Sequence, residues 1–194
     1  MKIAVLALQG DFAEHEKMLT AAGIDYLELR QASDLKQEYD GLILPGGEST
    51  AQGKLLRDLG MFEPLKKQIA EGLPVLATCA GMILLAEKLV NDDRKHFAVL
   101  PVSVRRNAYG RQLGSFRTYG KVGKLQKVPM TFIRAPYIEN VQPGAAVLAK
   151  VDEHIVAVRY KNQVALSFHP ELDDDSRIYE SFLQNVVEPW RSKN

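Results

Sequence analysis

One stretch of the chain decides its fold: Pro74-Val75-Leu76-Ala77-Thr78-Cys79-Ala80-Gly81-Met82-Ile83-Leu84-Leu85-Ala86-Glu87. The apolar run from Pro74 to Ala77, opened by a proline, predicts a short buried strand. The apolar residues at 82, 85, 86 and 89 share one face of a helix, so their spacing predicts a helix from Met82 onward. A tight strand-to-helix turn is therefore expected over residues 78–81.

The only cysteine of the protein, Cys79, lies in that turn between Thr78, Ala80 and Gly81. Small neighbours suit such a turn, because the backbone doubles back close to itself. The turn would lift the thiol above the carboxyl edge of the sheet, beside the free N–H groups of the helix start, as in a nucleophile elbow. Those dipoles favour the thiolate, which is the reactive form. A buried structural cysteine is the alternative interpretation, and the turn alone leaves both open.

The first half of the chain alternates strands and helices. Strands are expected at Ile3–Leu8, Tyr26–Leu29 and Gly41–Leu44, and helices at Phe12–Ala22, Gln52–Leu59 and Met61–Glu71. Glycine or proline follows several of these segments and ends them. Strand and helix in this rhythm indicate a mostly parallel sheet covered by helices on both faces.

The second half is richer in strands. Short candidates lie at residues 98–104, 115–118, 130–133 and 146–150, broken by Gly, Pro and Asn. His154–Tyr160 and Val164–Phe168 flank three polar residues and predict a hairpin. A last helix is expected over Ser176–Trp190. We therefore predict one α/β domain, residues 1–194, with a β-rich second half.

The composition is that of an ordinary globular protein. The 194 residues are 46% hydrophobic and 25% charged, and the net charge of +1 gives no strong attraction to nucleic acid or a membrane surface. A single cysteine excludes an internal disulfide and a multi-cysteine metal site. The apolar opening Ile3–Leu8 is too short for a secretory leader, and no other stretch could span a bilayer. We expect a cytoplasmic protein.

A base for the thiol is expected at the same sheet edge, because sites in open α/β sheets lie beyond the carboxyl ends of the strands. Four segments should meet there: Gln9-Gly10-Asp11, Gly46-Gly47-Glu48, Cys79 and His169-Pro170-Glu171. A thiolate needs a base to move its proton, and the base needs an acceptor that fixes its tautomer. His169 and Glu171 suit these roles, although a packed histidine beside a surface glutamate is the alternative. His15, His96 and His154 lie in helical or loop contexts, where we expect no such partner.

Glycines and arginines add candidate binding groups. Gly46-Gly47 after a strand is commonly a plain turn, but glycines also let backbone N–H groups approach a developing oxyanion. The segment 46–55 fails the phosphate-binding loop pattern at two positions, Glu48 and Leu55. Arg106 and Arg134 lie near strand ends, where one of them could hold a substrate carboxylate by two hydrogen bonds.

Taken together, these segments resemble the class I (triad) glutamine amidotransferases, and most closely the glutaminase subunits of pyridoxal 5'-phosphate synthases. The matching segments are Leu8-Gln9-Gly10-Asp11 with Glu14-His15, Leu44-Pro45-Gly46-Gly47-Glu48-Ser49-Thr50, Thr78-Cys79-Ala80-Gly81-Met82, Arg106-Asn107 with Gly110-Arg111-Gln112 and Ser115-Phe116, Phe132-Ile133-Arg134-Ala135-Pro136, and Ser167-Phe168-His169-Pro170-Glu171. One departure is Ala77, where the wider class usually has glycine. Alanine is small, so we expect no loss of activity from it.

The resemblance implies a three-layer flavodoxin-like fold and the hydrolysis of L-glutamine to L-glutamate and ammonia. Cys79 would attack the side-chain carboxamide and form a γ-glutamyl thioester. His169 would pass the proton to the leaving ammonia and then activate water, and Glu171 would orient the ring. The backbone N–H groups of Gly47 and Ala80 would form the oxyanion hole. The residues that would hold glutamine are Gly47, Glu48, Ser49, Arg106, Ile133 and Arg134. No metal or organic cofactor is needed for this chemistry.

The resemblance also implies a partner. Ammonia would pass to a separate synthase subunit that builds pyridoxal 5'-phosphate, within a multimeric complex, and the segment Gln9–Glu16 would lie at that interface. One alternative is a stand-alone flavodoxin-like cysteine hydrolase or stress protein, in which the segments of Arg106 and Arg134 would lack a purpose. Another is a binding module without enzymatic activity, in which Cys79 is merely buried.

Overall fold

The computed structural model describes residues 1–90, 92–106 and 114–193. The strands are β1 (Lys2–Leu6), β2 (Asp25–Leu29), β3 (Gly41–Leu44), β4 (Val75–Thr78), β5 (Ala86–Val90), β6 (Leu100–Arg105), β7 (Ser115–Val122), β8 (Leu125–Ile133), β9 (Tyr137–Val141), β10 (Ala146–Val151), β11 (His154–Tyr160) and β12 (Gln163–Leu166). The helices are α1 (Phe12–Ala21), α2 (Ser49–Asp58), α3 (Phe62–Ala70), α4 (Ala80–Leu85), α5 (Arg177–Phe182) and α6 (Glu188–Arg191), with shorter helical turns η1 (Ala32–Lys36), η2 (Pro170–Leu172) and η3 (Leu183–Val187). Asn107 and residues 110–112, which belong to one of the segments named above, lie outside the described residues.

Among the described residues, ten strands form one sheet in the order β2-β1-β3-β4-β12-β11-β9-β6-β5, and β10 pairs with β11. The strands β2, β1, β3 and β4 are parallel to their neighbours, and β12 is parallel to β4, whereas β11 and β9 are antiparallel to their neighbours. The remaining two strands, β7 and β8, form a separate hairpin. The predicted α/β class, with a mostly parallel sheet and a β-rich second half, is confirmed.

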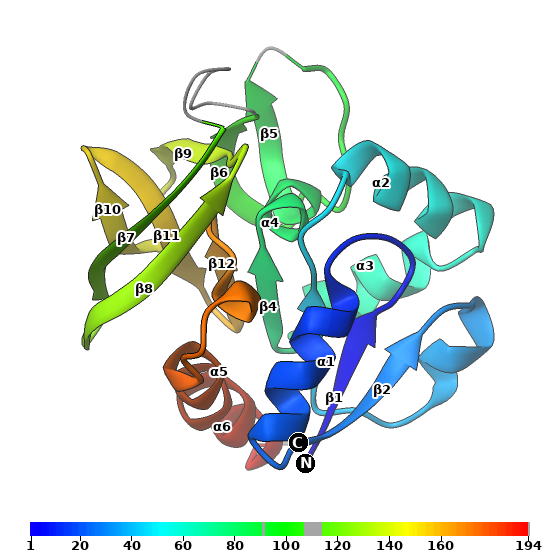
Figure 1. Cartoon of the computed structure of the whole chain (residues 1–194). Coiled ribbons are helices and arrows are strands. Elements are labelled where there is room, and N and C mark those ends of the chain that lie inside the picture. The colour runs from blue at the N-terminus through cyan, green and yellow to red at the C-terminus, as the bar shows by residue number, and fades with distance from the viewer. Residues whose placement is uncertain (91, 107–113, 194) are drawn as a thin grey trace.

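The sheet is covered on both faces, which makes three layers. One apolar cluster joins the sheet to α2, α3 and α4, with Leu56 and Leu65 fully buried. The second joins the opposite face to α1, α5 and the β7–β8 hairpin, with Leu19 and Phe132 buried. Figure 1 shows α1 in front of the sheet and α3 behind it. Burial of both faces explains why β1, β3 and β4 are nearly continuous apolar runs rather than alternating ones.

The helix predicted after Cys79 is shorter than its spacing indicated. Helix α4 ends at Leu85, and Ala86–Val90 is strand β5, paired in parallel with β6. The carbonyl of Leu84 accepts a hydrogen bond from the N–H of Phe97 (2.9 Å), where a continuing helix would use residue 88. The prediction of a helix through residue 89 is therefore wrong, because pairing with a distant strand overrides the local periodicity.

The second half contains the predicted hairpin between β11 and β12. Strand β9 was missing from the prediction, and its hydrogen bonds to β6 and β11 are long-range contacts. The last helix runs as α5, the π-helical turn η3 and α6, close to its predicted bounds. Of the described helices, none combines the length and apolarity that crossing a membrane requires.

Candidate active site

Four loops meet at the carboxyl edge of the parallel strands, as predicted. They follow β1, β3, β4 and β12. The N–H of Asp11 donates to the carbonyl of Gly46 (3.1 Å), and the N–H of Cys79 donates to the carbonyl of Leu166 (2.8 Å) at the end of β12. A Cβ on Gly46 would lie only 2.4 Å from the ring of His169. Glycine at 46 therefore lets the loop after β3 pack directly against the histidine.

Cys79 occupies a strained backbone conformation directly after β4. Its φ of 46° and ψ of −103° lie in a region that residues other than glycine rarely adopt. Such strain costs about 1–3 kcal/mol and is common at active sites, where the surrounding structure imposes it. Helix α4 starts at the next residue, and a Cβ on Gly81 would lie 2.1 Å from the carbonyl oxygen of Leu44. The small residues around the thiol are thus required by the tight approach of α4 to β3.

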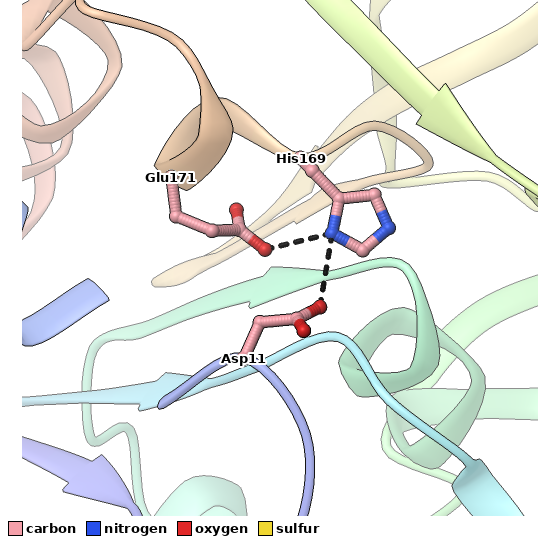
Figure 2. Close-up of side chains that lie close together, drawn as sticks. All are labelled: Asp11, His169 and Glu171. Carbon is pink, nitrogen blue, oxygen red and sulfur yellow. Dashed lines mark hydrogen bonds and ion pairs between the residues drawn. The ribbon is translucent and has the colours of Figure 1, made fainter. Parts of the chain in front are cut away.

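His169 and Glu171 form a buried hydrogen-bonded pair. The Nδ1 of His169 lies 2.8 Å from Oε1 of Glu171, and the two side chains are 3% and 0% exposed. Asp11 Oδ2 lies 3.4 Å from the same nitrogen. Figure 2 shows both carboxylates facing Nδ1, with Nε2 on the opposite side of the ring. Because a carboxylate only accepts hydrogen bonds, Nδ1 carries the proton and Glu171 is its nearer acceptor.

The surroundings of His169 favour its protonated form. Burial alone lowers the pKa of His169, but hydrogen bonds with Asp11, Cys79 and Glu171 outweigh burial and raise it to about 12. The hydrogen bond to His169 in turn lowers the pKa of Asp11, against the effect of burial. The ring therefore stays protonated through the neutral pH range. It contacts the carboxylates of Asp11 and Glu171 and the sulfur of Cys79.

The same three side chains could be considered as a metal centre. The ligand atoms of Asp11, His169 and Glu171 all lie within 4.8 Å of one another. A histidine must be neutral to bind a metal, because the protonated nitrogen has no free lone pair. The raised pKa of His169 therefore favours a hydrogen-bonded catalytic pair over a metal site.

Buried amides hold the Gly46-Gly47 loop in place. The Nε2 of Gln52, which is fully buried, donates to the carbonyl of Gln9 (2.9 Å) and to the carbonyl of Gly46 (3.3 Å). The side-chain oxygen of Gln9 accepts the N–H of Glu48 (2.8 Å). These contacts set the orientation of the peptide that carries the N–H of Gly47, and they link it to the loop after β1.

Glu48 and Arg106 are joined in a charged cluster beside this loop. Glu48 accepts two backbone N–H groups at the start of α2 (3.0 and 2.7 Å) and lies 3.1 Å from Arg106 Nη2. Arg106 Nη1 also lies 3.1 Å from Asp92. Hydrogen bonds from Arg94, and then from Arg106, hold the pKa of Asp92 well below its usual range. Arg94 in turn donates to the hydroxyl of Thr50 (2.7 Å), so the cluster braces the first turn of α2.

The other predicted site residues lie around this edge. Ser49 is buried at the first position of α2, and Ala80 is buried at the first position of α4. Ile133 ends β8, and Arg134 follows with an exposed side chain and a φ of 42°. Strand β8 is tied to the histidine, because the N–H of His169 donates to the carbonyl of Thr131 (2.8 Å). The structure thus brings Glu48 and Arg106 into contact but leaves the Arg134 side chain exposed to solvent.

Sequence reasoning missed several members of the site. Asp11 was placed at the edge without a role, and Asp92 and Arg94 were not singled out. The expectation that His15 lacks a partner is wrong, because its Nε2 lies 3.5 Å from Glu171 Oε1. The burial of His15 could have been predicted from the spacing, because His15 lies four residues before Leu19, on the buried face of α1. Asp92 and Arg94 follow β5, the strand that was predicted as helix, so their place could not be found from spacing.

Comparison with known proteins shows the family of this chain. The family model described as SNO glutamine amidotransferase family matches residues 5–188. The chain is 64% identical over 186 residues to the pyridoxal 5'-phosphate synthase subunit PdxT of Desulfitobacterium hafniense (strain Y51), covering 96% of this chain and 94% of that protein. It is 50% identical over 191 residues to PdxT of Streptococcus pneumoniae (strain ATCC 700669 / Spain 23F-1), covering 97% and 99%. A crystal structure described as a glutamine amidotransferase superposes with a TM-score of 0.89 at 42% identity, covering 94% of this chain and 97% of that one.

Proposed function

Because the chain belongs to the SNO glutamine amidotransferase family, we propose that it hydrolyses L-glutamine at Cys79, with His169 and Glu171 as its partners. The protein is the glutaminase subunit of a pyridoxal 5'-phosphate synthase, and residues 1–194 act as one amidotransferase domain. The observation that carries the assignment of the triad is the buried His169–Glu171 hydrogen bond of 2.8 Å beside the strained turn of Cys79.

The charges at the site give the order of proton transfers. The sulfur of Cys79 attacks the carboxamide carbon, and His169, which starts protonated, carries the proton that the leaving nitrogen needs. The C–N bond breaks as Nε2 of His169 gives its proton to the leaving nitrogen, which departs as ammonia. The neutral ring then takes a proton from water, whose oxygen attacks the γ-glutamyl thioester and releases glutamate. Glu171 keeps Nδ1 protonated and the ring oriented throughout.

Backbone and side-chain groups around the thiol would bind the substrate. The N–H groups of Gly47 and Ala80 stabilise the negative oxygen of the tetrahedral intermediate. Glu48 and Arg106 are suited to the α-amino and α-carboxylate groups of glutamine, because they carry the complementary charges. We place Ser49, Ile133 and Arg134 in the same binding site. The ammonia passes to the synthase subunit, and we propose a cytoplasmic location for the complex.

Labelling with a substrate analogue tests the assignment of the nucleophile. A diazoketone analogue of glutamine is expected to alkylate Cys79 at a stoichiometry of about one label per chain, because thiolate nucleophilicity and glutamine recognition coincide there. Peptide mass spectrometry locates the label. Protection by excess glutamine, with none by lysine, is the specificity control. A label on any other residue, or a thiol that reacts only after unfolding, would contradict the proposal.

Arg106→Ala is expected to raise the KM for glutamine by about 10-fold to 100-fold, because a charge-assisted hydrogen bond contributes about 1.5–3 kcal/mol. The effect on kcat should be smaller, since Arg106 would hold the α-carboxylate of glutamine rather than the reacting carboxamide. Arg105→Ala is the matched control, because this neighbouring arginine pairs with Glu139 instead (2.7 Å). Steady-state ammonia release in the presence of the synthase subunit gives both constants. An unchanged KM would remove Arg106 from the substrate site.

A further inference from the structure

A second histidine lies directly behind the triad. His15, on α1, is fully buried, and its Nε2 lies 3.5 Å from Oε1 of Glu171, the oxygen that also accepts from His169. We propose that His15, held by Tyr179 and Thr78, is a positioning residue that fixes the Glu171 carboxylate for His169. The inference rests on the proposed function, because it assigns His15 to the same triad.

The contacts of His15 form a continuous chain between four elements. Its Nδ1 lies 2.8 Å from the hydroxyl of Tyr179 on α5, and its Nε2 lies 3.1 Å from Oγ1 of Thr78 at the end of β4. Thr78 Oγ1 lies 3.5 Å from Oε1 of Glu171 in η2. Tyr179 is 1% exposed and Thr78 is 0% exposed, so water does not compete for these groups. The chain ends on the carboxylate that orients the catalytic ring.

Only one direction of hydrogen bonding satisfies all of these groups. The Glu171 carboxylate accepts only, so the Thr78 hydroxyl points its hydrogen toward Oε1 and must itself accept from His15. His15 therefore carries its proton on Nε2, and Nδ1 accepts from the Tyr179 hydroxyl. The other tautomer would aim the lone pair of Nε2 at a carboxylate oxygen 3.5 Å away. The arrangement runs from Tyr179 through His15 and Thr78 to Glu171.

The ionisation of the chain is consistent with this direction. Burial lowers the pKa of His15, outweighing the opposite effect of the Glu171 charge, so the ring is neutral at neutral pH. Burial, and then the charge of Glu171, raise the pKa of Tyr179, so its hydroxyl stays a donor. Glu171 is thus supported by oriented neutral dipoles and does not share a proton with a second charged histidine.

Such support matters because two carboxylates lie within reach of the same ring nitrogen of His169. Asp11 Oδ2 lies 3.4 Å from the same Nδ1 that donates to Glu171, and Figure 2 shows the two acceptors on one side of the ring. Glu171 belongs to a helical turn of only three residues. Without the chain through His15, the carboxylate can rotate away and Nδ1 can turn toward Asp11. That rotation would move Nε2 relative to the sulfur of Cys79.

The test compares His15→Leu with His15→Gln in the complex with the synthase subunit. Leucine fills the site without a donor, and we expect it to lower kcat by about 10-fold to 100-fold with KM changed by less than about twofold, the effect of a misplaced catalytic group. Glutamine can place an N–H donor near the position of Nε2, and it should recover most of the lost kcat. A merely structural role would lower the melting temperature but leave kcat per folded molecule at the wild-type value in both variants. That result would overturn the proposal.

Tyr179→Phe provides a second variant in case His15→Leu does not fold. It removes only the hydroxyl that fixes the tautomer, and we expect kcat to fall by about 3-fold to 10-fold. Tyr39→Phe is the matched control, because it removes a hydroxyl that contacts Gln68 at the opposite edge of the sheet. Equal kcat in these two variants would also overturn the proposal. Failure of the wild-type complex to release ammonia would instead contradict the proposed function itself, so the two failures are distinguishable.

Discussion

Cys79→Ser is expected to reduce ammonia release from glutamine by about 10⁴-fold or more, because removal of the nucleophile from a triad removes most of its catalysis. A serine hydroxyl is a much weaker nucleophile than a cysteine sulfur at neutral pH, so we expect the attack on the carboxamide to be lost. The change is nearly isosteric, and Cys79 is only 7% exposed, so packing around the turn is retained. A coupled glutamate assay with the synthase subunit present measures the effect.

The melting temperature and the binding of the synthase subunit are the controls for Cys79→Ser. Cys79→Ser should keep the melting temperature of the wild-type chain and should still bind the synthase subunit, because the substitution leaves the loops after β1 and β3 unchanged. Turnover within tenfold of the wild type in a folded variant would remove Cys79 from its assigned role and would revive the alternative in which the thiol is only a buried core residue.

His169→Asn is expected to reduce kcat by about 10²-fold to 10⁴-fold, the usual contribution of a general acid–base group. The asparagine amide can still donate to Glu171 from nearly the position of Nδ1, so the buried carboxylate keeps a partner and the turn η2 stays in place. What disappears is Nε2, the atom to which we assign the proton transfers between sulfur, ammonia and water. Ammonia release and urea unfolding of the same preparation separate chemistry from stability.

His154→Asn is the matched control for that substitution. His154, at the start of β11, stacks on Tyr137 at a centroid distance of 4.2 Å, whereas His169 pairs with Glu171. His154→Asn should therefore keep kcat within about twofold, because it removes no group to which a proton transfer is assigned. Equal rates in His169→Asn and the wild type would assign the proton transfers to another group.

Much of the fold could be predicted from local patterns, for physical reasons. The strand at Gly41–Leu44 and the hairpin strand at His154–Tyr160 have the predicted bounds, because burial on both faces or a short polar turn leaves a strong local signal. Helix α4 was predicted too long and strand β5 was predicted as helix, since Ala86–Val90 becomes a strand only through pairing with β6. Local periodicity does not record which distant segment will supply a hydrogen-bonding partner.

The site residues likewise fall into those that local patterns predict and those that depend on long-range packing. Cys79, His169 and Glu171 could be singled out because each follows a strand end, and the topology rule places strand ends together. The buried contacts of Asp11, His15 and Tyr179 escaped notice, because they depend on how α1 and α5 pack over the sheet edge. Family membership sets aside the reading as a stand-alone hydrolase, while the roles of the individual residues stay predictions.

The most direct test of the central claim is ammonia release from L-glutamine by the wild-type chain, measured with and without the synthase subunit and with Cys79→Ser in parallel. Hydrolysis that rises when the synthase subunit is added, and that is lost in the variant, is the predicted result. Absence of hydrolysis by a complex shown to have assembled, or equal hydrolysis by Cys79→Ser, would contradict the assignment of this chain as a glutaminase acting through Cys79.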